Sequence, residues 1–192
     1  MATKRKTKKA PAKKSLITEH AFNFLKSYMN NASAVGFETS GQKLWLEYLK
    51  PYVDSQFTDP YGSAVGVINP DHKFKVVIEA HADEISWFVN YVSPEGLLYL
   101  KRNGGVDHQI APGQRVFIHG KKGIVKAVFG WPAIHTRLSN PDQKEPQPKV
   151  DNLFLDCGAR NKKEVEALGI HIGAVVTYQD GFDELAHDFY IG

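Results

Sequence analysis

Short β-prone runs, separated by glycine and proline, fill the sequence after Val92 and restrict what the chain can fold into. The runs cover residues 97–100, 115–119, 123–129 and 153–156. Short strands at this spacing, with turn residues between them, are typical of a small barrel or sandwich. We therefore predict a β-rich domain over residues 93–178. One helix interrupts it at residues 161–168, where Asn161 provides an N-cap and Gly169 ends the helix.

Residues 15–92 have a different pattern, which predicts an α/β layer. Apolar residues recur at helical spacing over residues 18–29, with Thr18 as the expected N-cap, and again over residues 40–50. A short strand is expected at residues 64–68, and the apolar run at residues 76–78 predicts a buried strand after it. Two helices followed by packed strands begin a layered α/β domain.

The last residues, 179–192, predict a turn and a strand that returns to this α/β domain. The predicted fold class is therefore α/β, with a mixed-sheet domain that a small barrel-like β-domain interrupts. A layered sheet needs more strands and covering helices than residues 15–92 and 179–192 provide. We therefore expect the α/β domain to continue beyond Gly192.

The first fourteen residues form a basic tail. They hold seven of the 24 Lys and Arg residues and no acid, so the formal net charge of +3 belongs to the tail and the remainder is mildly acidic. Because such a segment cannot bury enough apolar surface to offset its ordering entropy, we predict that residues 1–14 are disordered. The tail serves as a solubilising extension or as an arm for nucleic acid or another anionic surface, and the solubilising role is favoured.

No membrane or secretory segment is expected. No apolar stretch is long enough to cross a membrane, and the basic start lacks the apolar core of a secretory signal. Cys157 is the only cysteine, which excludes an intramolecular disulfide and makes a cytoplasmic location the default. We interpret Cys157 as a small buried apolar residue.

The tetrapeptide His81-Ala82-Asp83-Glu84 follows the apolar run and is a candidate metal site. Side chains alternate along an extended chain, so His81 and Asp83 share one face and Glu84 points to the other. A metal-bound imidazole usually donates its second ring N–H to a carboxylate or carbonyl, and Asp83 is placed for that role. Spacing alone leaves open a hydrogen-bonded structural histidine at a strand end. Glu84 is assigned to packing or to a contact behind the site.

Eight short motifs follow one another along the chain, and most contain a glycine. They are Gly36-Phe37-Glu38, Asp59-x-x-Gly62, His81-Ala82-Asp83-Glu84-Ile85, Gly104-Gly105-x-Asp107, Gly113-Gln114-Arg115-Val116, Pro132-x-x-His135, Asp156-x-Gly158-Ala159 and Gly169-x-x-x-Gly173. In this order they resemble the glutamyl aminopeptidase family of dinuclear-metal peptidases. That family includes tetrahedral, dodecameric aminopeptidases and some members labelled endoglucanases. The resemblance spans residues 15–192.

The resemblance implies a metallopeptidase catalytic domain that is interrupted by an oligomerisation domain at residues 93–178. It assigns His81 as a ligand of a two-metal site that holds zinc or cobalt, and Asp83 as the carboxylate that orients this ligand. Two such metals polarise the scissile carbonyl and activate water for peptide hydrolysis. The remaining ligands and the general base are expected beyond Gly192, so the chain alone should bind metal weakly and be inactive.

Three functions are compatible with these patterns to different degrees. The favoured function is a metal-dependent aminopeptidase that removes N-terminal residues from peptide substrates within a homo-oligomer. The second is a non-catalytic oligomerisation or binding module built on residues 93–178. An endoglucanase-type glycoside hydrolase ranks low, because the adjacent carboxylates of Asp83 and Glu84 on opposite faces cannot flank a glycosidic bond.

Two other histidines are interpreted separately. His135 follows a Trp-Pro pair in the β-rich domain and is a candidate for a substrate or interface contact, with an ordinary loop histidine as the alternative. His119 has no partner at ligand spacing, and we interpret it as a surface or edge residue.

Overall fold

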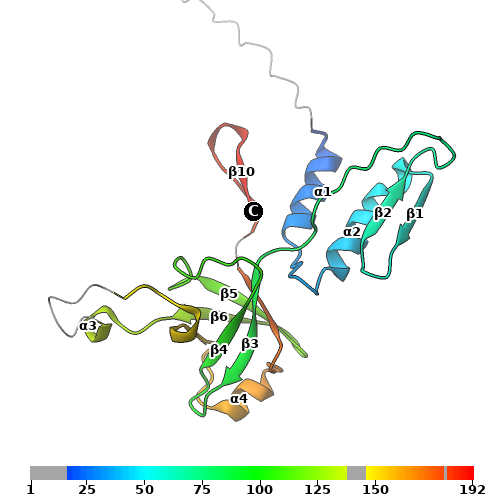
Figure 1. Cartoon of the computed structure of the whole chain (residues 1–192). Helices are drawn as coiled ribbons and strands as arrows, with labels where there is room; N and C mark the ends of the chain where they lie inside the picture. The colour runs from blue at the N-terminus through cyan, green and yellow to red at the C-terminus, as the bar shows by residue number, and fades with distance from the viewer. Residues whose placement is uncertain (1–16, 138–145, 180) are drawn as a thin grey trace, which may run out of the picture.

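The computed structural model describes residues 17–137, 146–179 and 181–192, which form two bodies (Figure 1). The predicted disordered tail, residues 1–14, lies outside the described residues. One body contains the first two helices and a two-stranded sheet, and the other is a closed barrel. This is the α/β architecture with a barrel-like domain that the sequence predicts. None of the helices described is long and apolar enough to span a membrane.

The N-terminal body consists of the two predicted helices and a small antiparallel sheet. Its elements are α1 (Glu19–Met29), α2 (Thr39–Leu49), the 3₁₀-helix η1 (Lys50–Tyr52), β1 (Ser55–Thr58) and β2 (Ala64–Val67). Thr18 caps α1 as expected, because its Oγ1 accepts a hydrogen bond from the Ala21 amide at 3.1 Å. Pro51 lies in the 3₁₀ turn that ends α2. Strand β1 was not predicted from the sequence, and it pairs with β2 across the Asp59–Gly62 turn.

The second body is a closed barrel of six strands, in which all neighbours are antiparallel. In spatial order the strands are β3 (Ser86–Val92), β4 (Leu98–Asn103), β7 (Phe154–Asp156), β6 (Gly123–Gly130), β5 (Arg115–Gly120) and β8 (Val175–Tyr178). Their connections carry α3 (Ile134–Arg137), the 3₁₀-helix η2 (Val150–Asn152) and α4 (Lys162–Ala167). Asn161 caps α4 as predicted, since its Oδ1 accepts a hydrogen bond from the Glu164 amide at 3.0 Å.

The hydrophobic core lies inside the barrel. The indole of Trp87 is fully buried there and contacts Phe129 and Tyr178, with ring centroids 4.8 and 5.0 Å away. Every residue of the main buried apolar cluster comes from the barrel strands or their connections. Among the described residues, Ala34 is the one buried apolar residue that precedes β3. The barrel therefore has a core of its own, whereas the N-terminal body has almost none.

The barrel starts at Ser86, ahead of the predicted domain boundary at residue 93. Strand β3 pairs with β4 on one side and β8 on the other, and Trp87 and Val89 lie in the barrel core. The sequence shows that residues 86–92 are apolar and β-prone, but it does not show which sheet they join. The sheet that residues 86–92 join is determined by pairing with residues far along the chain.

The apolar run before His81 does not form the predicted buried strand. Residues 74–80 belong to no strand of the described chain, and Val76, Val77 and Ile78 are 73%, 82% and 95% exposed. A strand is held in place by hydrogen bonds to a neighbouring strand. The described strands pair with one another in three separate sheets, and none of them pairs with this run.

The last residues form a small hairpin that packs against α1. Its parts are β9 (Asp183–Glu184), the 3₁₀-helix η3 (Ala186–Asp188) and β10 (Tyr190–Ile191). Phe22 of α1 contacts Phe182 and Tyr190, with ring centroids 5.6 and 5.3 Å away. The hairpin does not pair with the β1–β2 sheet, so the return of residues 179–192 into a larger sheet remains a prediction.

Candidate functional site

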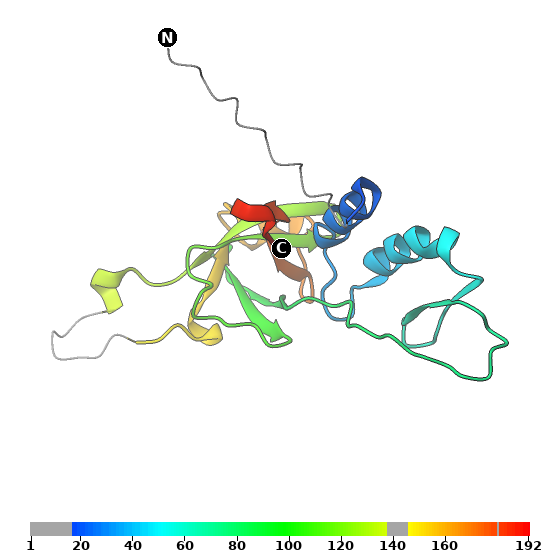
Figure 2. The ribbon, with the colours of Figure 1, turned by 90° about the horizontal axis from the view of Figure 1, so that it is seen from above.

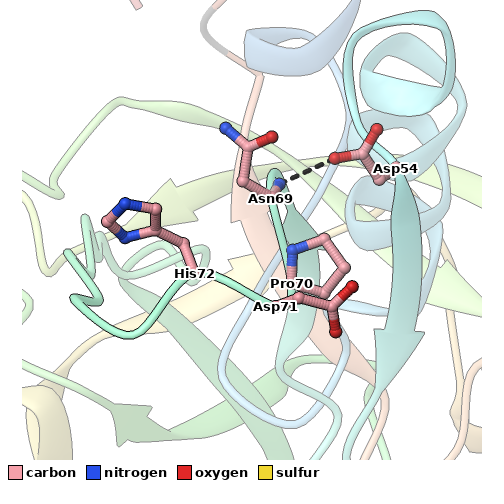
Figure 3. A pocket seen from close by; sticks show the side chains of 5 residues that line it. All are labelled: Asp54, Asn69, Pro70, Asp71 and His72. Carbon is pink, nitrogen blue, oxygen red and sulfur yellow. Dashed lines mark hydrogen bonds between the residues drawn. The ribbon is translucent and has the colours of Figure 1, made fainter.

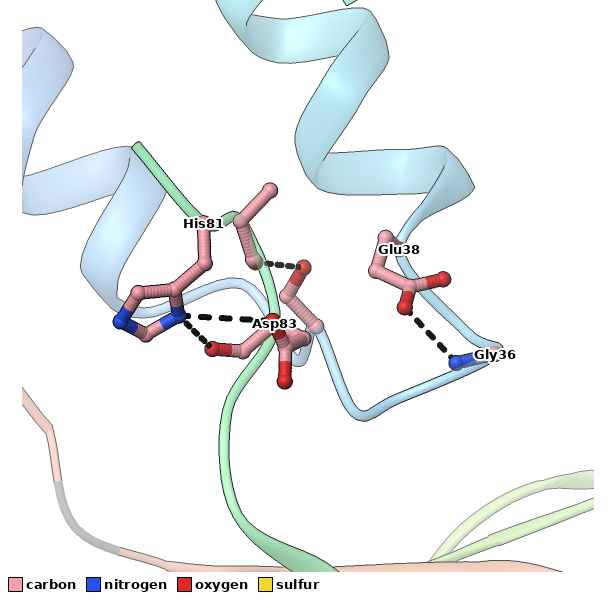
Figure 4. Close-up of polar contacts among 6 residues, drawn as sticks. Gly36, Glu38, His81 and Asp83 are labelled. Carbon is pink, nitrogen blue, oxygen red and sulfur yellow. Dashed lines mark hydrogen bonds and ion pairs between the residues drawn. The ribbon is translucent and has the colours of Figure 1, made fainter. Parts of the chain in front are cut away.

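His81 and Asp83 lie on the segment that connects the two bodies, shortly before β3 (Figure 4). Nδ1 of His81 is 3.0 Å from the main-chain oxygen of Asp83 and 3.4 Å from its Oδ1. Both neighbours are acceptors, so in the neutral ring Nδ1 carries the proton and Nε2 keeps its lone pair. Figure 4 shows the second ring nitrogen on the side turned away from Asp83. An imidazole held in this way can bind a metal through Nε2.

The His81–Asp83 pair is open to solvent. The two side chains are 84% and 39% exposed, so their mutual attraction is well screened and contributes little to stability. Within the described ranges, no group of three or more His, Cys, Asp or Glu side chains is placed to hold a metal ion. His81 therefore fits a metal as a single ligand, whereas a catalytic zinc takes about three protein ligands.

Glu84 contacts the N-terminal body instead of His81, in agreement with its assignment to packing. Its Oε1 accepts a hydrogen bond from the Ser33 amide at 2.6 Å, and its own amide donates to the Ser33 oxygen at 2.8 Å. Burial raises the pKa of Glu84 above its ordinary 4.5, and the hydrogen bond from Ser33 opposes this shift. No sequence signal identifies Ser33, because 51 residues separate it from Glu84.

Several carboxylates of the family motifs shape turns. Glu38 Oε1 accepts a hydrogen bond from the Gly36 amide at 2.7 Å (Figure 4), and Gly36 has a φ of 81°, which favours glycine. Asp59 Oδ1 accepts hydrogen bonds from the amides of Tyr61 and Ser63 at 2.9 and 2.8 Å. These carboxylates are engaged within their own turns.

His135 lies on α3 and is exposed. Figures 1 and 2 show α3 at the end of the barrel that is remote from α1 and α2. In the same helix, the guanidinium carbon of Arg137 is 3.5 Å from the centre of the Trp131 ring. The structure therefore does not bring His135 to His81, and any role of His135 is in a separate contact.

An open pocket lies beside the β1–β2 sheet, but the polar side chains that line it do not converge on one point. It is lined by Asp54, Asn69, Pro70, Asp71 and His72 (Figure 3). Asp54 Oδ2 accepts a hydrogen bond from the Asn69 amide at 2.7 Å. Figure 3 shows His72 turned away from both carboxylates. The pocket is thus a weaker candidate than the His81–Asp83 pair.

His119 lies where the two bodies meet, so its interpretation as a surface or edge residue is wrong. Its Nε2 is 3.0 Å from Thr177 Oγ1, and its ring contacts Phe37 with centroids 5.4 Å apart. Burial lowers the pKa of His119 below its ordinary 6.5. Alternation along β5 predicts that His119 faces outward, but it cannot show that the loop before α2 covers this face of the barrel.

The fold is that of a known class of peptidases. The TET aminopeptidase from the marine sediment archaeon Thaumarchaeota archaeon SCGC AB-539-E09 matches with a TM-score of 0.81 and 26% sequence identity. The match covers 87% of this chain and 46% of that chain. The α/β body joined to a closed barrel is thus a fold that this chain shares with the TET aminopeptidase class.

Comparison of sequences identifies the family. SgcX of Escherichia coli K12, a candidate aminopeptidase by its name, is 28% identical over 174 residues, which cover 91% of this chain and 43% of SgcX. FrvX of the same organism, also named as a candidate aminopeptidase, is 31% identical over 166 residues, covering 84% and 45%. The sequence pattern of the M42 glutamyl aminopeptidase family matches residues 62–192. The chain belongs to this family and spans less than half the length of these curated relatives.

Proposed function

We propose that the protein is a metal-dependent aminopeptidase and that these 192 residues are a part of it that is inactive alone. Its site holds two divalent metal ions, zinc or cobalt, and removes N-terminal residues from peptides. His81 is one metal ligand and Asp83 orients it. The other ligands and the general base come from outside these residues. Family membership and the names of the relatives support this class of reaction.

The observation that carries the proposal is the contact of His81 Nδ1 with Asp83, at 3.0 Å to the main-chain oxygen. An acceptor at Nδ1 fixes the tautomer, raises the basicity of Nε2 and turns Nε2 toward a ligand. Bound metals supply Lewis acidity and an activated water. The contribution of this chain is Nε2 of His81 as a ligand. The side chain of His81 is 84% exposed, which leaves room for an ion and its other ligands.

The test is hydrolysis of an aminoacyl anilide by the full-length protein with zinc or cobalt. We expect His81→Ala to abolish the activity and Asp83→Asn to lower it about 10- to 100-fold. His72→Ala is the matched control, because the exposed His72 ring also has its Nδ1 3.1 Å from a main-chain oxygen, that of Phe74. Unchanged activity in His81→Ala would refute the ligand assignment.

We also propose that the barrel mediates a homo-oligomer, through surfaces that lie within residues 93–178. Large apolar side chains that are exposed on the barrel strands and their connections are candidates for this interface: Ile110 (58%), Ile124 (60%), Ile134 (47%) and Ile172 (58%). His135, next to Ile134, would then contact a neighbouring subunit or the substrate. Light scattering on Ile134→Lys tests this proposal by measuring the size of the oligomer. Glu95 is exposed on the turn between β3 and β4, and Glu95→Lys is the control. An unaltered oligomer in Ile134→Lys would remove α3 from the interface.

A non-catalytic oligomerisation or binding module is the second candidate, because the barrel has a complete core of its own. An oligomeric full-length protein that hydrolyses no peptide would favour it. The structure gives an endoglucanase little support. Glu84 accepts a hydrogen bond from the Ser33 amide and faces the N-terminal body, so it is not placed to act with Asp83 across a glycosidic bond.

A further inference from the structure

Ser33 is tied by three hydrogen bonds to the segment that carries His81. Two of them pair Ser33 with Glu84, from the Ser33 amide to Oε1 at 2.6 Å and from the Glu84 amide to the Ser33 oxygen at 2.8 Å. The third runs from Ser33 Oγ to the main-chain oxygen of Ala82 at 2.7 Å. Ser33 is only 7% exposed, so water competes poorly for these bonds. One residue of the loop between α1 and α2 therefore holds the main chain on both sides of Asp83.

The hydrogen bonds of Ser33 determine where Asp83 lies. The Ala82 carbonyl and the Glu84 amide flank Asp83, so fixing both restricts the φ and ψ of Asp83 and the direction of its carbonyl. That carbonyl is the group 3.0 Å from Nδ1 of His81. Little else restrains the ring, because His81 is 84% exposed and residues 74–80 pair with no strand of the described chain.

We propose that Ser33 and Glu84 are positioning residues for the metal-binding histidine. They fix Asp83, and Asp83 holds the His81 ring with Nδ1 protonated and Nε2 directed to a ligand. This inference rests on the proposed role of His81 as a metal ligand. Ser33 and Glu84 themselves act only through Asp83.

The chemistry of the pair predicts which substitutions preserve the function. Glu84 is required here as an acceptor for one amide, and a neutral carbonyl oxygen can take that place. Glu84→Gln therefore retains the contact, whereas Glu84→Leu keeps a similar volume and removes the acceptor. Ser33→Ala removes only the hydroxyl that binds the Ala82 oxygen.

The test uses the full-length protein and three spectroscopic measurements. Amide hydrogen exchange at position 84 reports whether the main-chain pair with Ser33 persists. The ¹⁵N shifts of the His81 ring report which nitrogen is protonated. Line broadening by Co²⁺ reports whether His81 binds a metal. Ser27→Ala on the exposed face of α1 and Glu47→Leu on the exposed face of α2 are the matched controls.

In Glu84→Leu we expect the protection of the amide at position 84 to fall about tenfold, as for the loss of one hydrogen bond to a charged group. The His81 ring should change to the tautomer mixture of an unrestrained histidine. Ser33→Ala should give a smaller change in the same direction, and Glu84→Gln and both controls should match the wild type. Barrel amides should stay protected throughout, because the core lies in the barrel.

A wild-type His81 spectrum in Glu84→Leu would overturn the proposal. If Glu84→Leu loses the protection of its barrel amides, the variant is unfolded and Ser33→Ala is used in its place. A wild-type His81 spectrum in Ser33→Ala would then overturn the proposal. A different result would refute the proposed function. If Co²⁺ does not broaden His81 in the wild type while the ring still responds to Glu84→Leu, the ligand role is refuted and the positioning contact stands.

Discussion

The main chain of Gly130 lies directly against the ring of Phe154, its partner on the neighbouring strand. A Cβ at Gly130 would overlap three carbons of that ring. The contact joins β6 to β7 and so contributes to the closure of the barrel.

Gly130→Ala should therefore destabilise the protein by about 1–3 kcal/mol, because the half-buried ring of Phe154 has to move. Urea unfolding measures this loss. Gly105→Ala is the control, since a Cβ there meets no atom within 4 Å. Phe154→Leu combined with Gly130→Ala should recover part of the loss, and a simple sum of the two single effects would contradict the steric explanation.

Stability should depend on pH through His119. Burial lowers its pKa in the folded state below the 6.5 of an ordinary histidine, so the unfolded chain binds this proton more readily. The stabilisation is complete above pH 6.5 and is lost as pH falls through the lowered folded value. Thr177 and Phe37, which contact the ring, are uncharged and do not compensate. Unfolding of His119→Gln, compared with wild type between pH 7.5 and 5, should show a flatter profile.

Phe22→Ala should release the C-terminal hairpin without unfolding the barrel. Phe22 contacts both Phe182 and Tyr190, and each aromatic pair contributes about 0.5–1.5 kcal/mol. Hydrogen exchange should therefore increase over residues 182–191 and remain unchanged in the barrel strands. Equal loss of protection in both regions would show that the hairpin and the barrel unfold as one unit.

His81→Ala should leave the free energy of unfolding within about 0.5 kcal/mol of wild type, because substitutions of exposed side chains rarely cost more. The side chain is 84% exposed, and its hydrogen bond and ion pair within the described residues are both with Asp83. Thermal unfolding checks this. A large decrease in Tm would mean that a loss of activity in this variant reflects folding.

Local signals were sufficient for much of the fold. Thr18 and Asn161 were recognised as caps because capping depends on the first helical turn alone, and both side chains accept the expected amide. Strands β4, β5, β6 and β7 of the barrel were predicted because turn residues mark their ends.

Contacts distant in sequence could not be predicted. Residues 86–92 joined the barrel because Trp87 pairs with Val176 and Phe88 with Val175, and no pattern near β3 indicates those partners. The apolar run at residues 76–78 predicted a buried strand, yet burial depends on a neighbouring strand that a local pattern does not identify.

The difference between local signals and contacts distant in sequence also applies to the candidate site. His81 and Asp83 are two residues apart, so alternation was enough to expect their contact, although the main-chain oxygen of Asp83 is the nearer acceptor. The pairing of Glu84 with Ser33 spans 51 residues and required the folded chain.

The closed ring of six strands limits how copies of this protein can associate. Every barrel strand already has two neighbours, so the barrel has no free edge strand to which another strand could add. Copies that meet through this part of the molecule must therefore recognise one another by the shape and polarity of their side chains. Such recognition can be altered one residue at a time while the ring beneath it stays intact.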